Sequence, residues 1–140
     1  RFSCTYEDGT VEAVSYDAAG NEIGRTALRT ANTETRLCLV PEEETVRPGG
    51  LAFVQLRYTD ENGTVKSLER GTVTVKVRGG TLLGLGSACA YSERGYLSDT
   101  TDTYFGEALA VVRADADADT VELTAADGTH NAACCIPCKE

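Results

Sequence analysis

The chain has 140 residues, of which 41% are hydrophobic and 25% are charged, and its formal net charge is −9. This length predicts one ordinary domain, or one domain plus a fragment of another, with a hydrophobic core. The acidic balance disfavours nucleic acid as a partner, because an acidic surface repels phosphate groups. No apolar run approaches the ~18 residues that a membrane helix needs, so no membrane partner is expected.

The start of the chain bears on how its function is interpreted. The sequence begins at Arg1, contains no methionine and opens with no basic segment followed by an apolar one. We therefore expect a processed product or a segment cut from a longer protein. Such a segment need not carry the activity of its parent.

Alternation of apolar and polar residues dominates the sequence. Val73, Val75 and Val77, for example, alternate with threonine and basic side chains, which is typical of a strand with one buried and one solvated face. Turn dipeptides such as Asn62-Gly63 separate these runs. No segment has helical periodicity, so an all-β sandwich is predicted. Strands are expected near residues 2–6, 11–16, 22–29, 35–40, 51–59, 72–78, 81–85, 107–114, 120–126 and 132–137.

The spacing of these strands indicates two parts of unequal size. The polar stretch around residues 31–34 is typical of a linker. The strands before it are too few to form a core, because small sheets are only marginally stable alone. We therefore expect residues 1–32 to be the last strands of a preceding β domain plus the linker. Residues 33–140 are expected to form a complete immunoglobulin-like β-sandwich of about seven strands.

The six cysteines leave two thiol states open. An even number permits three disulfides, but a domain of this size does not need cross-links and free cysteine is a common buried residue, so free thiols are expected. Cys135 and Cys138 have the spacing of a zinc ligand pair, without a second pair to complete the four ligands. Free thiols favour the bacterial cytoplasm over an oxidising compartment, but the compartment stays open.

Side chains suited to catalysis or metal binding are few. His130 is the only histidine and follows a turn, which favours a solvated surface position. Glu42–Glu44 lie in a linker-like turn, which is typical of a solvated face rather than of a glycosidase carboxylate pair. The alternating Asp115, Asp117 and Asp119 lack the glycine and glutamate that a calcium loop requires. No catalytic, cofactor-binding or metal-binding residue is therefore assigned.

One long segment, at residues 86–106, lacks apolar periodicity. Loops longer than ~12–15 residues are uncommon inside a compact domain and are often functional. This loop carries or adjoins Tyr91, Tyr96, Tyr104 and Phe105. Aromatic rings pack on protein and also stack on sugar rings, and the chain has no tryptophan. We expect docking against a neighbouring domain first, local packing second and direct glycan contact third.

Several stretches of the sequence resemble a known family. The first runs from Tyr6 to Asp17 (YEDGTVEAVSYD) and continues at Leu28–Ala31 (LRTA). The second begins at Leu37 and includes LGLGSA at Leu83–Ala88 and YFGEALAVVRA at Tyr104–Ala114. In these stretches the chain resembles the end of an Ig-like domain, followed by the C-terminal Ig-like sandwich, of β-galactosidase-like enzymes of glycoside hydrolase family 2.

The resemblance implies a non-catalytic accessory role in a bacterial glycoside hydrolase. The catalytic glutamates of this family lie on a (β/α)8 barrel, and this chain has neither the length nor the helices for one. The implied partners are the catalytic barrel of the parent chain and a partner subunit, with no cofactor. Where some relatives have an Asn-Gly-Asp turn after an apolar strand, this chain has Gly86–Cys89. A carbohydrate-binding module and an Ig-like spacer of a bacterial surface adhesin remain alternatives.

Overall fold

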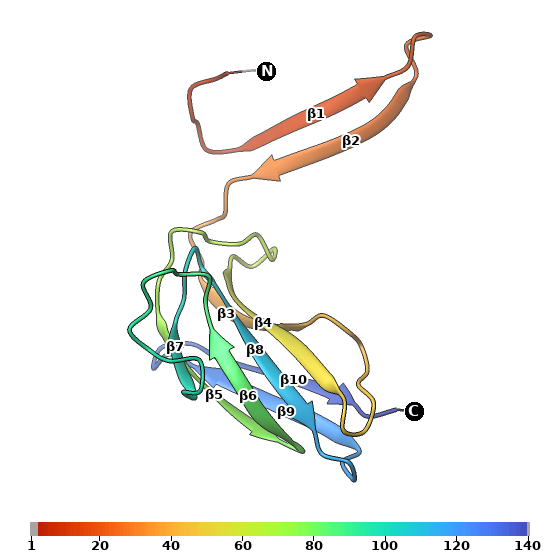
Figure 1. Ribbon diagram of the computed structural model, residues 1–140. Coiled ribbons are helices and arrows are strands. Elements are labelled where there is room, and N and C mark those ends of the chain that lie inside the picture. The colour runs from red at the N-terminus through yellow and green to blue at the C-terminus, as the bar shows by residue number, and fades with distance from the viewer. Residues whose placement is uncertain (1–2, 140) are drawn as a thin grey trace.

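The computed structural model describes residues 3–139, and the regular structure within them is entirely β (Figure 1). Strands β1 (Thr10–Tyr16) and β2 (Glu22–Arg29) form a separate antiparallel hairpin. The other strands form two four-stranded sheets with the orders β3-β4-β8-β6 and β10-β9-β5-β7. The predicted all-β sandwich is confirmed. The sandwich strands are β3 (Arg36–Pro41), β4 (Leu51–Thr59), β5 (Thr72–Arg78), β6 (Gly80–Gly86), β7 (Thr100–Asp102), β8 (Glu107–Ala114), β9 (Thr120–Ala126) and β10 (Asn131–Pro137).

The hydrophobic core lies between the two sheets and is built from alternate residues of both. Val54 and Leu56 of β4 project inward from one sheet, and Val73 and Val75 of β5 from the other, each with an exposed fraction between 0% and 2%. The period-two pattern therefore identified the inner face correctly. Burial of these side chains is the main stabilising contribution to the sandwich, at about 25 cal/mol per Å² of apolar surface.

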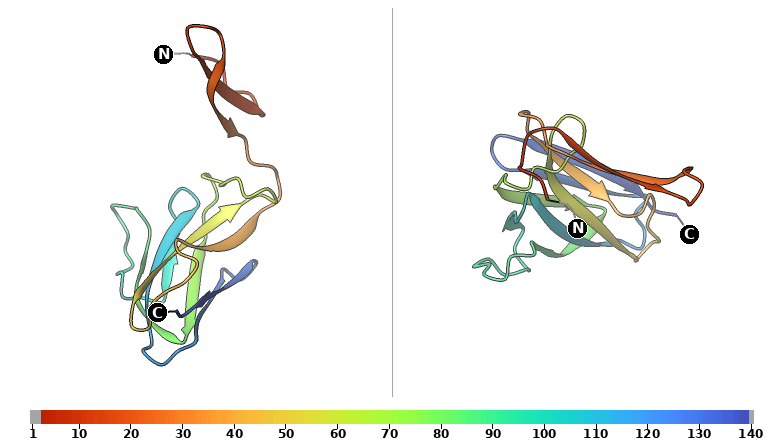
Figure 2. Two further views of the ribbon diagram at one scale, coloured as in Figure 1. Left: turned by 90° about the vertical axis from the view of Figure 1, so that its right-hand side faces the viewer. Right: turned by 90° about the horizontal axis from the view of Figure 1, so that it is seen from above.

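The β1–β2 hairpin stands away from the sandwich, joined to it by the linker at residues 30–35 (Figures 1 and 2). All of its strand residues are exposed except Val14, which is half-buried. A two-stranded ribbon without a covered face is at best marginally stable in water.

Strand positions agree closely with expectation from residue 11 onward, where the predicted ends lie within one residue of those observed. The strand expected near 2–6 is wrong: residues 3–6 form no strand, and residue 2 lies outside the described residues. A strand needs a hydrogen-bonding neighbour, and the structure pairs β1 only with β2.

Strand β7 is an addition that the sequence did not predict. It pairs with β5 at the edge of its sheet, so the sandwich has eight strands rather than about seven. Its contacts with β5 are polar: the Thr72 hydroxyl donates to Asp102 at 2.6 Å, and the Thr74 and Thr100 hydroxyl groups lie 2.9 Å apart. A short polar edge strand has no apolar alternation, which is why the segment resembled a loop.

Gly79-Gly80 forms a corner between the sheets rather than a hairpin turn, because β5 and β6 lie in different sheets. Gly79 has a φ of 70°, and a Cβ atom there would lie 2.1 Å from the Thr120 carbonyl oxygen. Only glycine fits such a conformation and such a close approach. The chain thus passes from the inner strand of one sheet to the edge of the other.

Candidate functional site

A groove crosses the outer face of the β3-β4-β8-β6 sheet. It has a volume of about 720 Å³ and is lined by residues of β4, β6 and β8 and by the two ends of the long loop. We call it the aromatic groove and define it by Tyr96, Tyr104, Phe105, Leu109 and Val111. The structure thus brings three of the four predicted aromatic candidates together. The fourth, Tyr91, does not line the groove.

The Tyr96 ring is positioned by the glycines of β6. A Cβ atom at Gly86 would lie only 2.3 Å from Cδ1 of the ring, so the absence of a side chain there gives the ring its place. The Leu85 N–H donates to the Tyr96 carbonyl at 2.8 Å, which ties the loop to the sheet edge. Gly86, the second glycine of the Gly-Leu-Gly sequence in β6, therefore makes room for an aromatic side chain.

Tyr104 and Phe105 are presented by a tight two-residue turn. The backbone groups of Tyr104 and Glu107 exchange hydrogen bonds of 2.9 and 3.1 Å around Phe105 and Gly106, whose φ angles are 51° and 77°. Two positive φ values are the mark of a type I′ turn. A bulky residue rarely adopts such a φ, and outliers of this kind concentrate at functional sites. The Tyr104 and Phe105 rings meet edge to face, with centroids 4.5 Å apart.

Two polar pairs lie beside the rings. Arg57 Nε donates to Glu107 Oε1 at 2.8 Å, and Gln55 Nε2 donates to Glu42 Oε1 at 3.1 Å. All four residues line the groove. The site is therefore an apolar surface with a hydrogen-bonding border, and both of its carboxylates are already paired.

His130 is not the solvated surface residue that its turn position predicted, because its side chain is only 29% exposed. Its Nδ1 atom lies 2.9 Å from Asp127 Oδ2, and the buried Tyr58 hydroxyl donates to the same oxygen at 2.5 Å. The other Asp127 oxygen accepts the backbone N–H groups of Thr129 and His130 at 2.8 and 2.6 Å. The turn itself thus holds the histidine.

This Tyr58–Asp127–His130 cluster is a structural unit. Burial of Asp127 opposes its ionisation, but the four hydrogen bonds that the carboxylate accepts outweigh this and hold its pKa well below the usual value. Burial, and then the bond to Asp127, raises the pKa of Tyr58. A Cβ atom at Gly71 would lie 2.1 Å from the Tyr58 hydroxyl, so backbone closes over this group. A hydroxyl packed in this way is not accessible to a substrate. Sequence reasoning missed the cluster because Tyr58 and Asp127 are 69 positions apart.

The remaining candidates form no centre. Glu42–Glu44 are exposed, and so are Asp115, Asp117 and Asp119. Within residues 3–139, no group of three or more His, Cys, Asp or Glu side chains is arranged to hold a metal ion. The six cysteines have free thiols. The part of the chain that the structure describes contains no helix suited to crossing a membrane.

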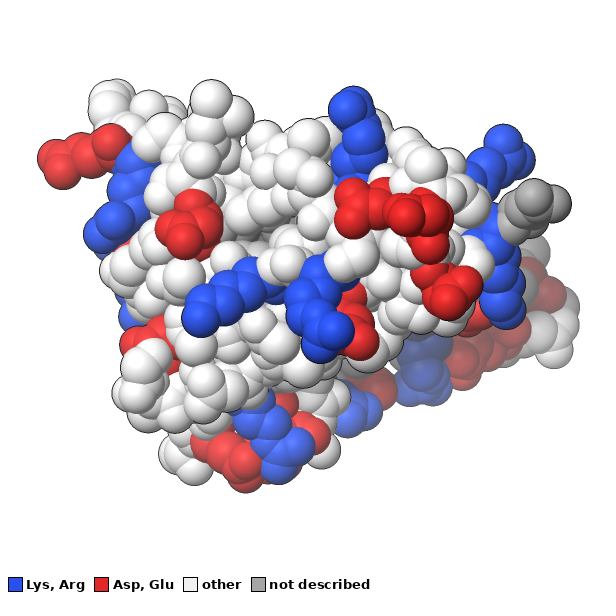
Figure 3. All heavy atoms as spheres, turned by 90° about the horizontal axis from the view of Figure 1, so that it is seen from below, with Lys and Arg blue, Asp and Glu red and all other residues white. Residues whose placement is uncertain are grey.

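Charge is spread rather than concentrated on the face shown in Figure 3. Acidic and basic side chains alternate over it, with uncharged surface between them. A nucleic-acid site would need a continuous basic patch. This face does not offer one.

Comparison with known proteins places the chain in a family. Residues 37–133 match the family described as glycoside hydrolase family 2 C-terminal domain 5. The chain belongs to this family. The resemblance seen in the sequence is thereby confirmed, and the sandwich is a C-terminal domain of family 2 glycoside hydrolases. No curated protein matches the chain.

Solved structures of family 2 enzymes contain the same arrangement of strands. Two crystal structures of a family 2 member from Bacteroides cellulosilyticus match with 25% and 26% identity and TM-scores of 0.84 and 0.86, covering 94% and 98% of this chain. A β-glycosidase from Bacteroides vulgatus shares the fold at 17% identity, with a TM-score of 0.83 over 94% of this chain. The chain spans 18% of the length of each of these proteins.

Proposed function

We propose that this chain is a non-catalytic accessory part of a larger bacterial family 2 glycoside hydrolase, and that it packs against the catalytic barrel or a partner subunit through the aromatic groove. The groove itself is the observation that carries the proposal. Its apolar surface includes the exposed side chains of Phe105 and Leu109 and is bordered by paired polar groups. Contiguous exposed apolar surface with a polar rim is typical of protein interaction sites.

The state of the carboxylates supports a non-catalytic role. A glycosidase needs two carboxyl groups that face each other across the scissile bond, one as acid and one as base or nucleophile. In the groove, Glu107 is held by Arg57 and Glu42 by Gln55. Both carboxylates thus accept hydrogen bonds from neighbouring side chains. The parent enzyme would supply the catalytic pair from its barrel.

The proposal also assigns the two parts of the chain. Residues 1–32 would be the C-terminal strands of a preceding Ig-like domain plus the linker, and residues 33–140 the C-terminal sandwich. The exposure of both faces of the β1–β2 hairpin supports this assignment, because the ribbon needs a cover that this chain does not supply.

An assay on aryl β-glycosides tests the lack of activity. The purified chain should give no turnover above background, whereas the parent enzyme should hydrolyse at least one such substrate. Turnover by the chain that persists in repeated preparations and disappears in Glu107→Gln would contradict the proposal.

A groove variant tests the packing role. Leu109→Lys places a charge on the outer face of β8, so it should leave the stability of this chain nearly unchanged. In the parent enzyme it should loosen the sandwich and increase its release by limited proteolysis. Tyr91→Ala, outside the groove, is the matched control. Equal proteolysis of the Leu109→Lys and wild-type parent enzymes would refute docking through the groove.

A carbohydrate-binding module is the second candidate, and one observation favours it. Exposed rings lie beside Arg57, Gln55 and two carboxylates, which are groups that hydrogen-bond to sugar hydroxyls. Titration of the chain with galactosides and plant oligosaccharides, followed by tyrosine fluorescence, separates the two functions. Saturable binding that is lost in Tyr96→Ala or Tyr104→Ala would favour the module over the docking domain.

A further inference from the structure

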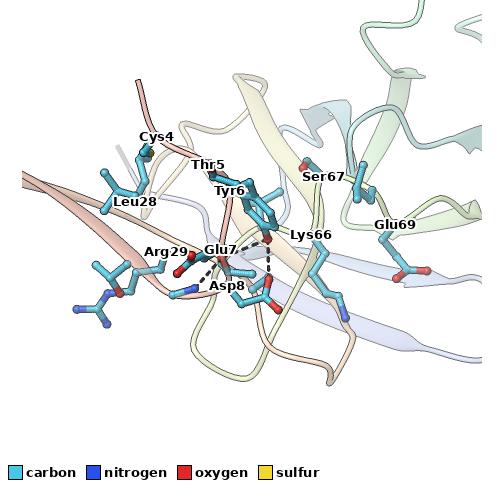
Figure 4. A pocket seen from close by; sticks show the side chains of 17 residues that line it. Cys4, Thr5, Tyr6, Glu7, Asp8, Leu28, Arg29, Lys66, Ser67 and Glu69 are labelled. Carbon is cyan, nitrogen blue, oxygen red and sulfur yellow. Dashed lines mark hydrogen bonds between the residues drawn. The ribbon is translucent and has the colours of Figure 1, made fainter. Parts of the chain in front are cut away.

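A second cleft, of about 750 Å³, lies where the hairpin approaches the sandwich (Figure 4). Tyr6 and Leu28 line it from the hairpin side, and residues 65–69 from the sandwich side. We call residues 60–69, which follow β4, the junction loop. Leu68 of this loop is 91% exposed and Leu28 is 78% exposed. Large apolar side chains from two separate segments thus surround one opening.

The hairpin lines this cleft with one apolar pair, Val11 and Leu28, and with the adjacent polar pair, Thr10 and Arg29. Paired residues of an antiparallel ribbon share a face, so Val11 and Leu28 lie together on one side. Glu12 and Arg25 lie on the other side and form an ion pair with each other. Arg25 forms a second ion pair with Glu22. Val11 and Leu28 both line the cleft. A body that covers the apolar face of the hairpin therefore also reaches the junction loop.

Asp60 fixes the near end of the junction loop to the linker. Its carboxylate is buried and accepts three backbone N–H groups, from Asn32 at 2.9 Å, Asn62 at 2.9 Å and Thr64 at 2.8 Å. The bond from Asn32 is the leading reason that the pKa of Asp60 is lowered. One carboxylate thus shapes the loop and holds the linker against it.

Lys66 holds the same linker from the far end of the loop. Its Nζ atom donates to the carbonyl oxygens of Thr33 and Glu34 at 2.8 and 3.0 Å and to the Thr35 hydroxyl at 2.7 Å. These bonds use all three donors of an ammonium group. Asp60 and Lys66, which we call the linker clamp, therefore set the direction in which the chain enters the sandwich.

We propose that the exposed side of the junction loop, centred on Leu68, is the docking surface for the preceding β domain to which the hairpin belongs. The inference rests on the proposed function, because that domain lies in the parent enzyme. The linker clamp then makes the joint rigid, and the two domains turn as one body.

The occupant follows from three observations. The apolar face of the hairpin requires the remainder of its own domain. Val11 and Leu28 of that face line the same cleft as Leu68. The family 2 structures from Bacteroides cellulosilyticus superpose on 94% and 98% of this chain, which includes most of the hairpin, and this chain is only 18% of their length. If the joint is fixed, the hairpin and the sandwich should have the same relative placement in these larger enzymes as in this chain.

Substitution of Leu68 tests the docking surface, with Leu97 as the matched control. Leu97 is 92% exposed and does not line the cleft. In this chain, Leu68→Asp and Leu97→Asp should each leave the unfolding midpoint within about 2 °C of wild type, because each side chain is solvated. In the parent enzyme, only Leu68→Asp should lower the midpoint of the C-terminal region, by about 4 °C or more.

Two outcomes would overturn the inference. One is a parent enzyme whose midpoint does not change on Leu68→Asp. The other is an equal fall in this chain and in the parent, which would show that Leu68 acts within the sandwich. If the aspartate variant of the parent does not fold, Leu68→Ser gives the same comparison with a smaller shift. The proposed function fails independently, through turnover by this chain or through the Leu109→Lys result, and neither involves Leu68.

Discussion

The hairpin and the sandwich have the same kind of alternating sequence, yet they differ completely in what they bury. Alternate residues of β4 and β5 are sealed between two sheets, whereas both faces of β1 and β2 meet solvent. Alternation therefore identifies which face of a strand is apolar. It does not say whether the surface that covers this face belongs to the same segment of chain.

Truncation of one leucine in each region should show the largest difference. Leu56→Ala leaves a cavity in the core and should reduce the free energy of unfolding by about 3 kcal/mol. Leu28→Ala, in the exposed hairpin, should change it by less than about 0.5 kcal/mol. Urea unfolding of this chain measures both. A loss of similar size at the two positions would mean that the hairpin packs on the sandwich in solution.

The same contrast explains how much of the fold the sequence predicted. Inward-facing residues such as Val54 and Val73 alternate strictly, because each lies opposite another sheet of this chain, and their strands were located to within one residue. β7 was missed because its bonds to β5 are made by hydroxyl and carboxylate groups rather than by apolar contact. The strand expected near 2–6 was wrong because an extended apolar run still needs a neighbouring strand.

The candidate site was predictable only in part. The long loop and its aromatic residues were visible in the sequence, but the distance of Tyr91 from the groove was not. Tyr96 differs from Tyr91 because its ring packs over Gly86, a contact by which β6 holds this part of the loop in the groove. The Tyr58–Asp127 bond likewise joins β4 of one sheet to the turn that follows β9 of the other. Contacts of this kind depend on how the sheets are stacked and have no local sequence signal.

Acid unfolding should distinguish the two regions with an effect of intermediate size. The folded-state pKa of Asp127 is lowered, so its ionised form contributes stability above the unfolded-state value of about 3.9, and this is lost as the pH falls below it. Tyr58→Phe removes one hydrogen bond to Asp127, so it should lower the free energy of unfolding by about 1–2 kcal/mol at pH 7. The further fall of this free energy at acid pH, called the acid limb, should then be less steep than in the wild type. Urea unfolding at a series of pH values between 7 and 2 measures both effects.

An aspartate of the hairpin provides the matched control for acid unfolding. The pKa of Asp17 is also lowered, chiefly by the hydrogen bond from the Asn21 side chain. Because the hairpin shares no core with the sandwich, Asp17→Asn should leave the acid limb of sandwich unfolding unchanged in this chain. An acid limb that changes in Asp17→Asn and not in Tyr58→Phe would contradict the assignment of acid sensitivity to Asp127.

The smallest expected effect concerns Phe105, where the sandwich resembles the hairpin in exposing an apolar side chain. Phe105 occupies the first central position of a type I′ turn with a positive φ, for which asparagine before glycine is preferred. Phe105→Asn should therefore change the free energy of unfolding by no more than about 0.5 kcal/mol, because relief of the backbone strain offsets the loss of the edge-to-face contact with Tyr104. Tyr91→Ala, at another exposed ring, should change nothing. Urea unfolding measures both variants. A loss of more than about 1 kcal/mol in Phe105→Asn would contradict the prediction and would mean that the ring is needed within the sandwich.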